Sequence, residues 1–469
     1  MKSSRAFRYQ KLAHVLREQI MTGFLKPNDF LPTEHQLCEQ YRLSRTSVRK
    51  ALELLEVEGL IERRPGAGTR VSAQFVLPED AARTFQILVP SPNFFVEHGG
   101  LDIFINEFRR LHPNVEISLL EAPTGADLAE HLRTHEKHGI KPDLVLTYDS
   151  LLRNLDNYEE FYDLEPLMSD GMPDIYPRLL EGLRFGSGRI AAPVTFSTVF
   201  LAYNPDLFES RQATKPYAGW TKDAFMEAAR TISADTNGDG LIDQYGLMFT
   251  RGIGRWPVFA MQNGLMSSAI SDYDDILQKT SAFLHDLLHR ERIAVTFNVD
   301  SLRTHQHPFK NGKAAMTLTT TYELASWLDE PLDFEPQIAP LPFGPCSSTL
   351  LTTNALLIPK CSPKPELAQS FLRTALGLEA QTSLCSETPF LSIVPAVNRT
   401  KVSAELLAFY NATEEAMPGN YHVHELFPDN ETMEELIENM NFFWLAIESA
   451  PAFARRWKRL VPRMAVLQP

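Results

Sequence analysis

The sequence is poor in cysteine and has no long apolar run. Its 469 residues include four cysteines, in none of the paired spacings typical of disulfide frameworks or zinc sites: Cys38, Cys346, Cys361 and Cys385. We therefore expect four free thiols in a reducing compartment. No segment has the length and character of a signal peptide or a membrane-spanning helix. The sequence thus predicts a cytoplasmic protein without a membrane partner.

Catalytic signatures are also missing. No GxSxG, Walker A or GxGxxG string occurs. The segment HDLLHRE puts His285 and His289 four residues apart, as in zinc proteases, but Asp286 stands where that chemistry needs glutamate. We interpret this pair as a surface pair on an amphipathic helix, and the runs HQH at 305–307 and YHVHE at 421–425 as solvated loop or strand edge. We predict no enzymatic activity and no cofactor.

Positive charge is scarce overall but concentrated at one end. The chain has 45 Lys and Arg against 59 Asp and Glu, a net charge of −14. Residues 1–75 nevertheless hold 13 basic and 8 acidic side chains. The chain thus has a small basic N-terminal part, the head, and a large acidic remainder, the body. This division suggests that the head binds a polyanion and that the body binds a different partner. The length predicts two or three domains.

Three helices are predicted in the head. Apolar residues recur at helical spacing over 9–21. Thr33 and Gln36 have the form of a capping box at the start of a second helix. Ser44 caps a third helix over 45–58, whose buried side we expect to contain Ala51, Leu54, Leu55 and Val57.

The second and third helices are joined by a tight turn, which predicts a helix-turn-helix. The third helix begins with residues that can reach base edges in a major groove: Arg45, Thr46, Ser47, Arg49 and Lys50. A hairpin follows over 60–71, and its arginines would lie along the DNA backbone: Arg63, Arg64 and Arg70.

The string from Leu31 to Val71 resembles the winged-helix domain of GntR-type bacterial transcription regulators, over about residues 5–72. The resemblance implies base or phosphate contacts for the start of the third helix, and wing contacts for Gly66, Gly68 and Thr69. The family usually has arginine where this chain has His35. We therefore leave that position out of the expected contacts.

Strand and helix patterns alternate after a polar linker. FQILVP, VEISLLEA and PDLVLTY have the character of strands, and helical segments separate them. This alternation predicts an α/β body with a parallel sheet. Ligands in such sheets bind beyond the carboxyl ends of the strands, where Tyr148 and Asp149 follow directly on DLVL.

Five blocks from RIAAPVTFSTVFLAYNPDLF to LLIPKCSPKPELAQSFL resemble the maltose-binding-like type II solute-binding proteins of ABC importers, over roughly residues 85–450. The fold class we expect is multidomain α+β: an N-terminal winged helix-turn-helix (1–72), a linker (73–84) and a two-lobed α/β body (85–469). We place lobe I at about 85–194 and 352–388, and lobe II at about 195–351 and 389–469.

A clamp for sugars needs aromatic faces and a few planar polar groups. Besides Tyr148 and Asp149, family position suggests five residues: Thr195, Phe196, Tyr322, Trp327 and Trp444. Trp256, in GRWPVF, is a sixth candidate. For each of them core packing is the competing interpretation. We expect two or three of the six to line a cleft, and we assign Trp220 to the core.

The segment DTNGDGLID has the front half of a calcium loop, with oxygen ligands at Asp235, Asn237, Asp239 and Asp243. Position twelve, which should carry a bidentate glutamate, is Gly246. A DxNxDGxID turn at this place is also common in the solute-binding family. We therefore interpret the segment as a hydrogen-bonded turn and keep calcium as a weak alternative.

Together these features predict a regulator of transcription, in our interpretation a repressor. It would bind an operator in double-stranded DNA as a homodimer and respond to a mono- or oligosaccharide. Two alternatives stay open. The body could sense an amino acid or peptide, or it could be a pyridoxal-phosphate aminotransferase, although we find no convincing context for a Schiff-base lysine.

Overall fold

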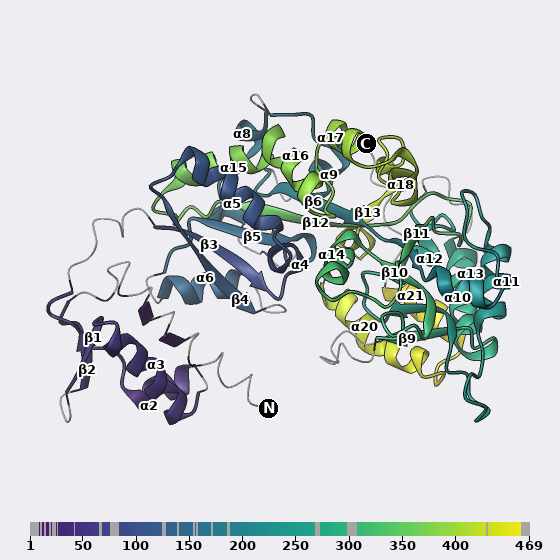
Figure 1. Ribbon diagram of the computed structural model, residues 1–469, viewed down its shortest axis with the longest axis horizontal. Helices are drawn as coiled ribbons and strands as arrows, with labels where there is room; N and C mark the ends of the chain where they lie inside the picture. The colour runs from purple at the N-terminus through teal and green to yellow at the C-terminus, as the bar shows by residue number, and fades with distance from the viewer. Residues whose placement is uncertain are drawn as a thin grey trace.

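The computed structural model describes residues 27–41, 43–64, 68–75, 84–123, 128–137, 140–152, 158–169, 172–184, 188–267, 273–297, 307–427 and 430–460, with a few isolated positions (Figure 1). Most of the helix predicted over 9–21 lies outside them, as do His305, Gly66 and most of the linker. Among the described residues, no helix is long and apolar enough to cross a bilayer.

The head is a winged helix-turn-helix, as predicted. Its elements are α2 (Glu34–Gln40), α3 (Arg45–Val57), and the antiparallel strands β1 (Ile61–Arg64) and β2 (Gly68–Val71). Thr33 and Gln36 form the predicted capping box: the Thr33 amide donates to Gln36 Oε1 at 2.9 Å, and the Gln36 amide donates to Thr33 Oγ1 at 3.3 Å. Ser44 caps α3 by accepting from the Ser47 amide at 3.2 Å.

The buried face of α3 differs from the prediction. Leu54 and Val57 are 36% and 88% exposed, whereas Val48 and Leu52 are buried with Leu55. The prediction is confirmed for Ala51 and Leu55, which are buried, and was wrong for Leu54 and Val57. The spacing 48, 52, 55 is the one that faces α2 and the wing.

A six-stranded sheet forms the centre of the first lobe, with strand order β13-β12-β5-β3-β4 and β6 paired to β12. The strands β3, β4 and β5 are parallel, as predicted, and β12 runs antiparallel to β5. Their bounds are β3 (Thr84–Ser91), β4 (Glu116–Pro123), β5 (Leu144–Tyr148), β6 (Ala192–Thr198), β12 (Leu350–Leu357) and β13 (Tyr421–His422).

Helices cover both faces of this sheet (Figure 1). Ile87 and Val89 of β3 pack in a cluster with α5, α15 and α16, whereas Leu88 packs with α6 on the other face. The helices of this lobe are α4 (Phe94–Glu97), α5 (Gly100–Leu111), α6 (Leu128–Lys137), α7 (Asp149–Leu152), α8 (Glu165–Ser169), α9 (Pro177–Gly182), α15 (Pro365–Leu376), α16 (Leu378–Glu387), α17 (Pro395–Lys401), α18 (Ala404–Phe409) and α19 (Val423–Leu426).

A five-stranded sheet forms the centre of the second lobe, in the order β11-β7-β10-β8-β9, with β8, β9 and β10 parallel. Its strands are β7 (Phe200–Tyr203), β8 (Tyr245–Thr250), β9 (Ala294–Phe297), β10 (Ala314–Thr319) and β11 (Gln337–Ala339). Its helices are α10 (Pro205–Ser210), α11 (Lys222–Ile232), α12 (Val258–Met261), α13 (Tyr273–His285), a π-turn over Asp286–Arg290, α14 (Thr321–Asp329), α20 (Asn430–Trp444) and α21 (Ala450–Leu460).

The packing bears on where the lobes divide. β6 continues in the first sheet to Thr198, beyond the predicted boundary at 194. Val397 of α17 and Leu407 of α18 are buried in the core cluster of the first sheet, although both lie beyond the predicted boundary at 388. This packing argues for boundaries near 198, 350 and 423, and the division into domains stays a prediction.

Candidate functional site

The start of α3 presents its polar residues outward. Arg45, Thr46, Arg49 and Lys50 are exposed and Ser47 is half-buried. Because the apolar side of α3 is buried in the head, the predicted DNA-contacting residues share the opposite, accessible side of one helix. This is the geometry that a recognition helix needs in order to enter a major groove.

The wing is a two-stranded hairpin in which Arg63 faces Thr69 and Arg64 faces Gly68. Gly68 has φ of +88°, a conformation that favours glycine, and it is exposed. Arg63 is half-buried and directed at the protein, because its Nη2 donates to Glu34 at 3.0 Å. The side chain of Arg64 and all of Gly66 lie outside the described residues.

In the body, the carboxyl ends of the parallel strands bring together polar groups of the first lobe. Tyr148 is half-buried at the end of β5, and Asp149 is 3% exposed. Burial raises the pKa of Tyr148 to about 12. Burial also raises the pKa of the Asp149 carboxyl, against the opposing effects of nearby His422 and of the Thr353 amide, which donates to it at 3.3 Å.

Tyr322 lies where the lobes meet, because α14 contacts both α4 and β6. Its ring packs on Phe390 at 5.6 Å, and it is 6% exposed. Burial raises the pKa of the Tyr322 hydroxyl, and the side chains of Asn354 and Thr195 lie near enough to lower it. Neither contact has the geometry of a hydrogen bond. A buried hydroxyl without a well-formed partner is a candidate for a hydrogen bond to a ligand.

Asn93 and Asn354 extend this group of polar side chains, and the sequence analysis missed both. Asn93 Nδ2 donates to Asn354 Oδ1 at 3.2 Å, and both side chains are buried. Asn93 follows the end of β3, so the rule that selected Tyr148 and Asp149 could also have selected it. Asn354 comes from the antiparallel strand β12, and its position depends on strand pairing with β5 and β6.

The second lobe contributes Arg255 and Glu323, also missed. Arg255 Nη2 lies 3.1 Å from Glu323, and Thr319 Oγ1 donates to the same carboxylate at 2.7 Å. Thr319 ends β10, so this ion pair lies at the carboxyl edge of the second sheet. Planar charged groups of this kind can bind the hydroxyls of a carbohydrate.

Thr195 and Phe196 are fully buried in β6. Thr195 Oγ1 donates to the Leu391 carbonyl at 2.8 Å, and the Phe196 ring packs edge-on against Tyr176 at 5.3 Å. Core packing and strand pairing therefore account for Phe196. Thr195 is close to the Tyr322 hydroxyl and stays a candidate.

The three predicted tryptophans are buried. Trp256 is 0% exposed and packs edge-on against Trp457 at 4.8 Å, and Trp444 lies in the same core cluster. Trp327 packs on Phe309 at 5.3 Å and lines a cavity of about 600 Å³ with Leu328, Pro331 and Phe334. Core packing, the competing interpretation, accounts for Trp256 and Trp444. Trp220 is also buried, as predicted, and its Nε1 donates to the Pro340 carbonyl.

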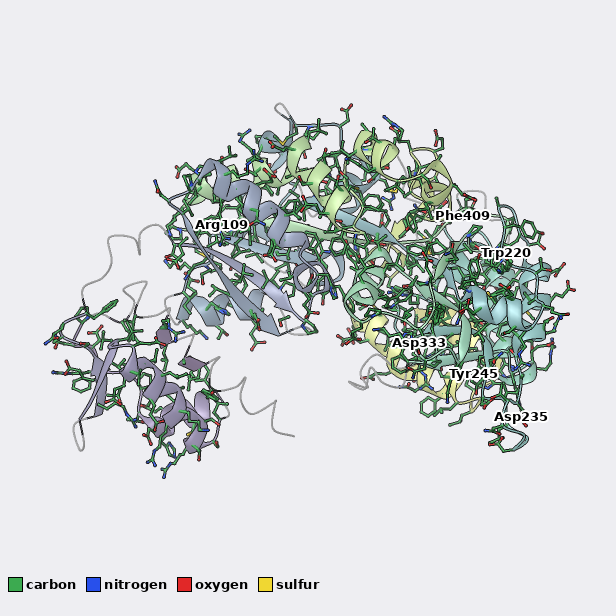
Figure 2. All side chains as sticks on the ribbon, in the orientation of Figure 1. Arg109, Trp220, Asp235, Tyr245, Asp333 and Phe409 are labelled. Atoms are coloured by element: carbon green, nitrogen blue, oxygen red, sulfur yellow. The ribbon has the colours of Figure 1, made fainter. Side chains whose placement is uncertain are left out.

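The segment 235–243 is a hydrogen-bonded turn. Asp235 accepts from the amides of Gly238 and Gly240, each at 2.7 Å, and Asp243 accepts from the Thr236 amide at 2.8 Å. The Gly240 amide is the largest of the effects that lower the pKa of Asp235. Figure 2 shows Asp235 at an outer tip of the second lobe. These hydrogen bonds are those of the predicted turn, and calcium stays the weak alternative.

Residues 421–422 form the edge strand β13, which fits the expected strand edge, but the expectation that the run 421–425 is solvated was wrong. His422 is 0% exposed; its Nε2 lies 2.9 Å from Thr353 Oγ1 and its Nδ1 lies 3.3 Å from Glu425. It is buried because it lies in β13 beneath Gly182, where an added Cβ would meet its ring. Donor atoms of His422, His424 and Glu425 lie within 4.8 Å of one another.

A metal is nevertheless a poor fit for that cluster. Arg178 Nη2 donates to both oxygens of Glu425, at 2.6 and 2.5 Å. Burial acts to raise the pKa of Glu425, but the hydrogen bond and charge of His422, with those of Arg178, outweigh it and hold the pKa at about 2. A cation bound to the carboxylate would have to displace a buried guanidinium. The cluster is therefore an ion-pair network.

The other histidine pair, expected on the surface of a helix, is partly exposed. His285 ends α13 and His289 lies in the π-turn; both are half-buried, with ring centroids 5.0 Å apart. Burial lowers the pKa of His289. Asp286 pairs with Arg290 at 2.8 Å, so its carboxylate is engaged within the turn.

Comparison with known proteins agrees with this architecture. Residues 8–71 match the family model of bacterial regulatory proteins of the gntR family, and residues 104–411 match that of bacterial extracellular solute-binding proteins. The second match spans more than half of the chain. The protein therefore belongs to the solute-binding protein family and carries a GntR domain at its N-terminus. A body of the aminotransferase type, one of the alternatives left open, is excluded by this fold.

Two curated relatives match the head alone. The arabinose metabolism transcriptional repressor of Geobacillus stearothermophilus is 40% identical over 72 residues, 15% of this chain and 20% of its own length. The mannosyl-D-glycerate transport/metabolism system repressor of Escherichia coli is 43% identical over 68 residues, 14% of this chain and 28% of its own length. The chain thus spans under a third of either relative.

Solved structures match the body. An ABC substrate-binding protein of Listeria monocytogenes, in complex with cycloalternan, has a TM-score of 0.65 at 17% identity, covering 80% of this chain and 97% of that one. UgpB of Mycobacterium tuberculosis, in complex with glycerophosphocholine, has a TM-score of 0.61 at 17% identity, covering 81% and 97%. At this identity the likeness shows the two-lobed fold.

Proposed function

We propose that this protein is a DNA-binding regulator of transcription, without enzymatic activity, whose body senses a small solute. The observation that carries the proposal is the pairing of two parts in one chain. A winged helix-turn-helix with an exposed polar start of α3 is joined to a solute-binding fold. The Geobacillus stearothermophilus and Escherichia coli relatives described above are named as repressors, which supports repression as the mode of action.

The solute we propose is a mono- or oligosaccharide. It would bind between the carboxyl edges of the two sheets, against polar groups of both lobes: Asn93, Tyr148, Asp149, Tyr322 and Asn354 with Arg255 and Glu323. Cycloalternan in the Listeria protein supports this choice. UgpB was solved in complex with glycerophosphocholine, so a phosphorylated solute is the second candidate for the ligand of the body.

Binding would act by closing the lobes and changing the arrangement of two heads. One recognition helix covers one half-site, so we propose a homodimer on a two-fold operator. A solute can shift this equilibrium only by its difference in affinity for the two arrangements, which for a usable switch is a few kcal/mol.

Two measurements on the full chain test the proposal. Thermal unfolding is followed with a panel of oligosaccharides, glycerophosphodiesters and amino acids, since a solute at about 100 times its Kd stabilises the folded state by roughly 2.7 kcal/mol. Selection from a random duplex pool then tests the head. A flat panel would contradict solute sensing, and recovery of unrelated sequences would contradict operator binding.

A further inference from the structure

Glu34 joins the recognition helix to the wing. It lies in the first turn of α2 and is half-buried, with 27% of its side chain exposed. Its Oε2 accepts from Arg49 Nε at 2.9 Å, and its Oε1 accepts from Arg63 Nη2 at 3.0 Å. One carboxylate therefore holds two of the arginines that the sequence assigns to DNA.

The two arginines meet this carboxylate through different atoms. Arg49 donates from its Nε, and among the described residues its Nη1 and Nη2 donate no hydrogen bond, while 58% of the side chain is exposed. Arg63 instead gives Nη2 to Glu34, and its Nη1 lies 3.8 Å from Glu56. The terminal fork of Arg49 is thus free to bind DNA, whereas that of Arg63 is engaged by the protein.

We propose that Glu34 is a positioning residue that determines base specificity, and that Arg63 anchors the wing rather than contacting DNA. This inference rests on the proposed DNA-binding function. A guanidinium reads guanine through two parallel hydrogen bonds to O6 and N7, which requires a fixed plane. Glu34 fixes that plane from the Nε edge before DNA arrives and ties the wing to the same point through Arg63.

If Glu34 had only a structural role, its substitution would have different effects. An acidic side chain in the first turn of a helix stabilises that helix through the macrodipole, so loss of Glu34 would lower stability. Loss of a negative charge would also strengthen binding to every DNA sequence equally. Neither effect changes which bases are preferred, so base preference is the quantity to measure.

The experiment compares full-length wild-type protein with Glu34→Gln and Glu58→Gln. Glu58 forms an ion pair with Arg17 at 2.5 Å in the same head, so its substitution removes one ion pair and one charge away from Arg49. Each protein selects sites from a random duplex pool, and Kd is then measured on the selected site, on single base-pair variants and on random DNA. Circular dichroism and the unfolding midpoint report folding.

We expect Glu34→Gln to lose about tenfold in preference at one base pair of each half-site, the discrimination of one bidentate contact. Its Kd for random DNA should not rise. Glu58→Gln should keep the full preference. In an Arg49→Ala background, Glu34→Gln should cost no further preference, because the residue it positions is gone.

Three outcomes would overturn the inference. Glu34→Gln could keep the wild-type preference while unfolding at lower temperature, which would leave it a structural role. The two glutamine variants could strengthen binding to all sequences alike, which would make the effect one of charge. A wild-type protein without any sequence preference would refute the DNA-binding function itself, and a result of that kind is distinct from the other two.

Discussion

Arg178 and Glu425 form an ion pair in the interior of the body, in which Arg178 Nη2 lies 2.6 and 2.5 Å from the two carboxylate oxygens. Arg178 Nε also donates to the Asn420 carbonyl at 2.6 Å, and its guanidinium lies 4.8 Å from the centre of the Tyr421 ring. The pair therefore joins α9 of the first lobe to the segment around β13 and α19, which leads into the second lobe.

Arg178→Ala should destabilise the body strongly, because it leaves the Glu425 carboxylate buried without its guanidinium partner, with polar contacts to His422 alone among the described residues. The expected loss is about 3–5 kcal/mol in the free energy of unfolding, measured by urea denaturation. Arg399→Ala is the matched control: Arg399 pairs with Glu414 on the surface, and its loss should cost less than about 1 kcal/mol. Equal effects of the two changes would contradict the buried pair.

The free energy of unfolding should decrease in acid, because the Glu425 carboxylate becomes protonated. Its pKa is lowered from 4.5 to about 2 in the folded state, so its contribution is fully present above about pH 4.5 and is lost as pH falls toward 2. That shift corresponds to roughly 3 kcal/mol. Because other carboxyls titrate in the same range, the quantity to measure is the difference between wild type and Glu425→Gln from pH 6 to 3. A difference independent of pH would refute the assignment.

Arg45→Ala should weaken binding to the selected operator by roughly 1–3 kcal/mol while changing binding to random DNA much less. Arg45 is exposed at the start of α3, so the folded head should survive the change. Arg109→Ala removes the same charge from the surface of α5 in the body (Figure 2) and should leave both affinities unaltered. Equal losses on operator and random DNA would identify Arg45 as a phosphate contact.

Tyr322→Phe should separate stability from ligand binding. The hydroxyl is buried and makes no well-formed hydrogen bond with any residue that the structure describes, so its removal should leave the free energy of unfolding unchanged or raise it. Loss of one hydrogen bond to a solute should weaken affinity about tenfold, measured by calorimetry with a solute found in the panel. Tyr217→Phe, at a tyrosine that is 50% exposed, is the control. A wild-type affinity in Tyr322→Phe would place the solute elsewhere.

The sequence by itself determined the order of the parts and the local structure of each. The Thr33–Gln36 capping box, the Ser44 cap and the alternation of strands and helices depend on neighbours in the chain, and all are present. The turn at 235–243 also closes on its own backbone, which is why its residues could be assigned without the fold.

Tertiary structure decided which polar groups meet. Glu34 contacts Arg49 and Arg63 across 15 and 29 residues, and Asn93 meets Asn354 across 261, so no local pattern contains either relationship. The same holds for His422, which local polarity placed in solvent and strand pairing with β12 places in the interior. Burial of a side chain depends on what packs over it, and here the covering residues come from distant parts of the chain.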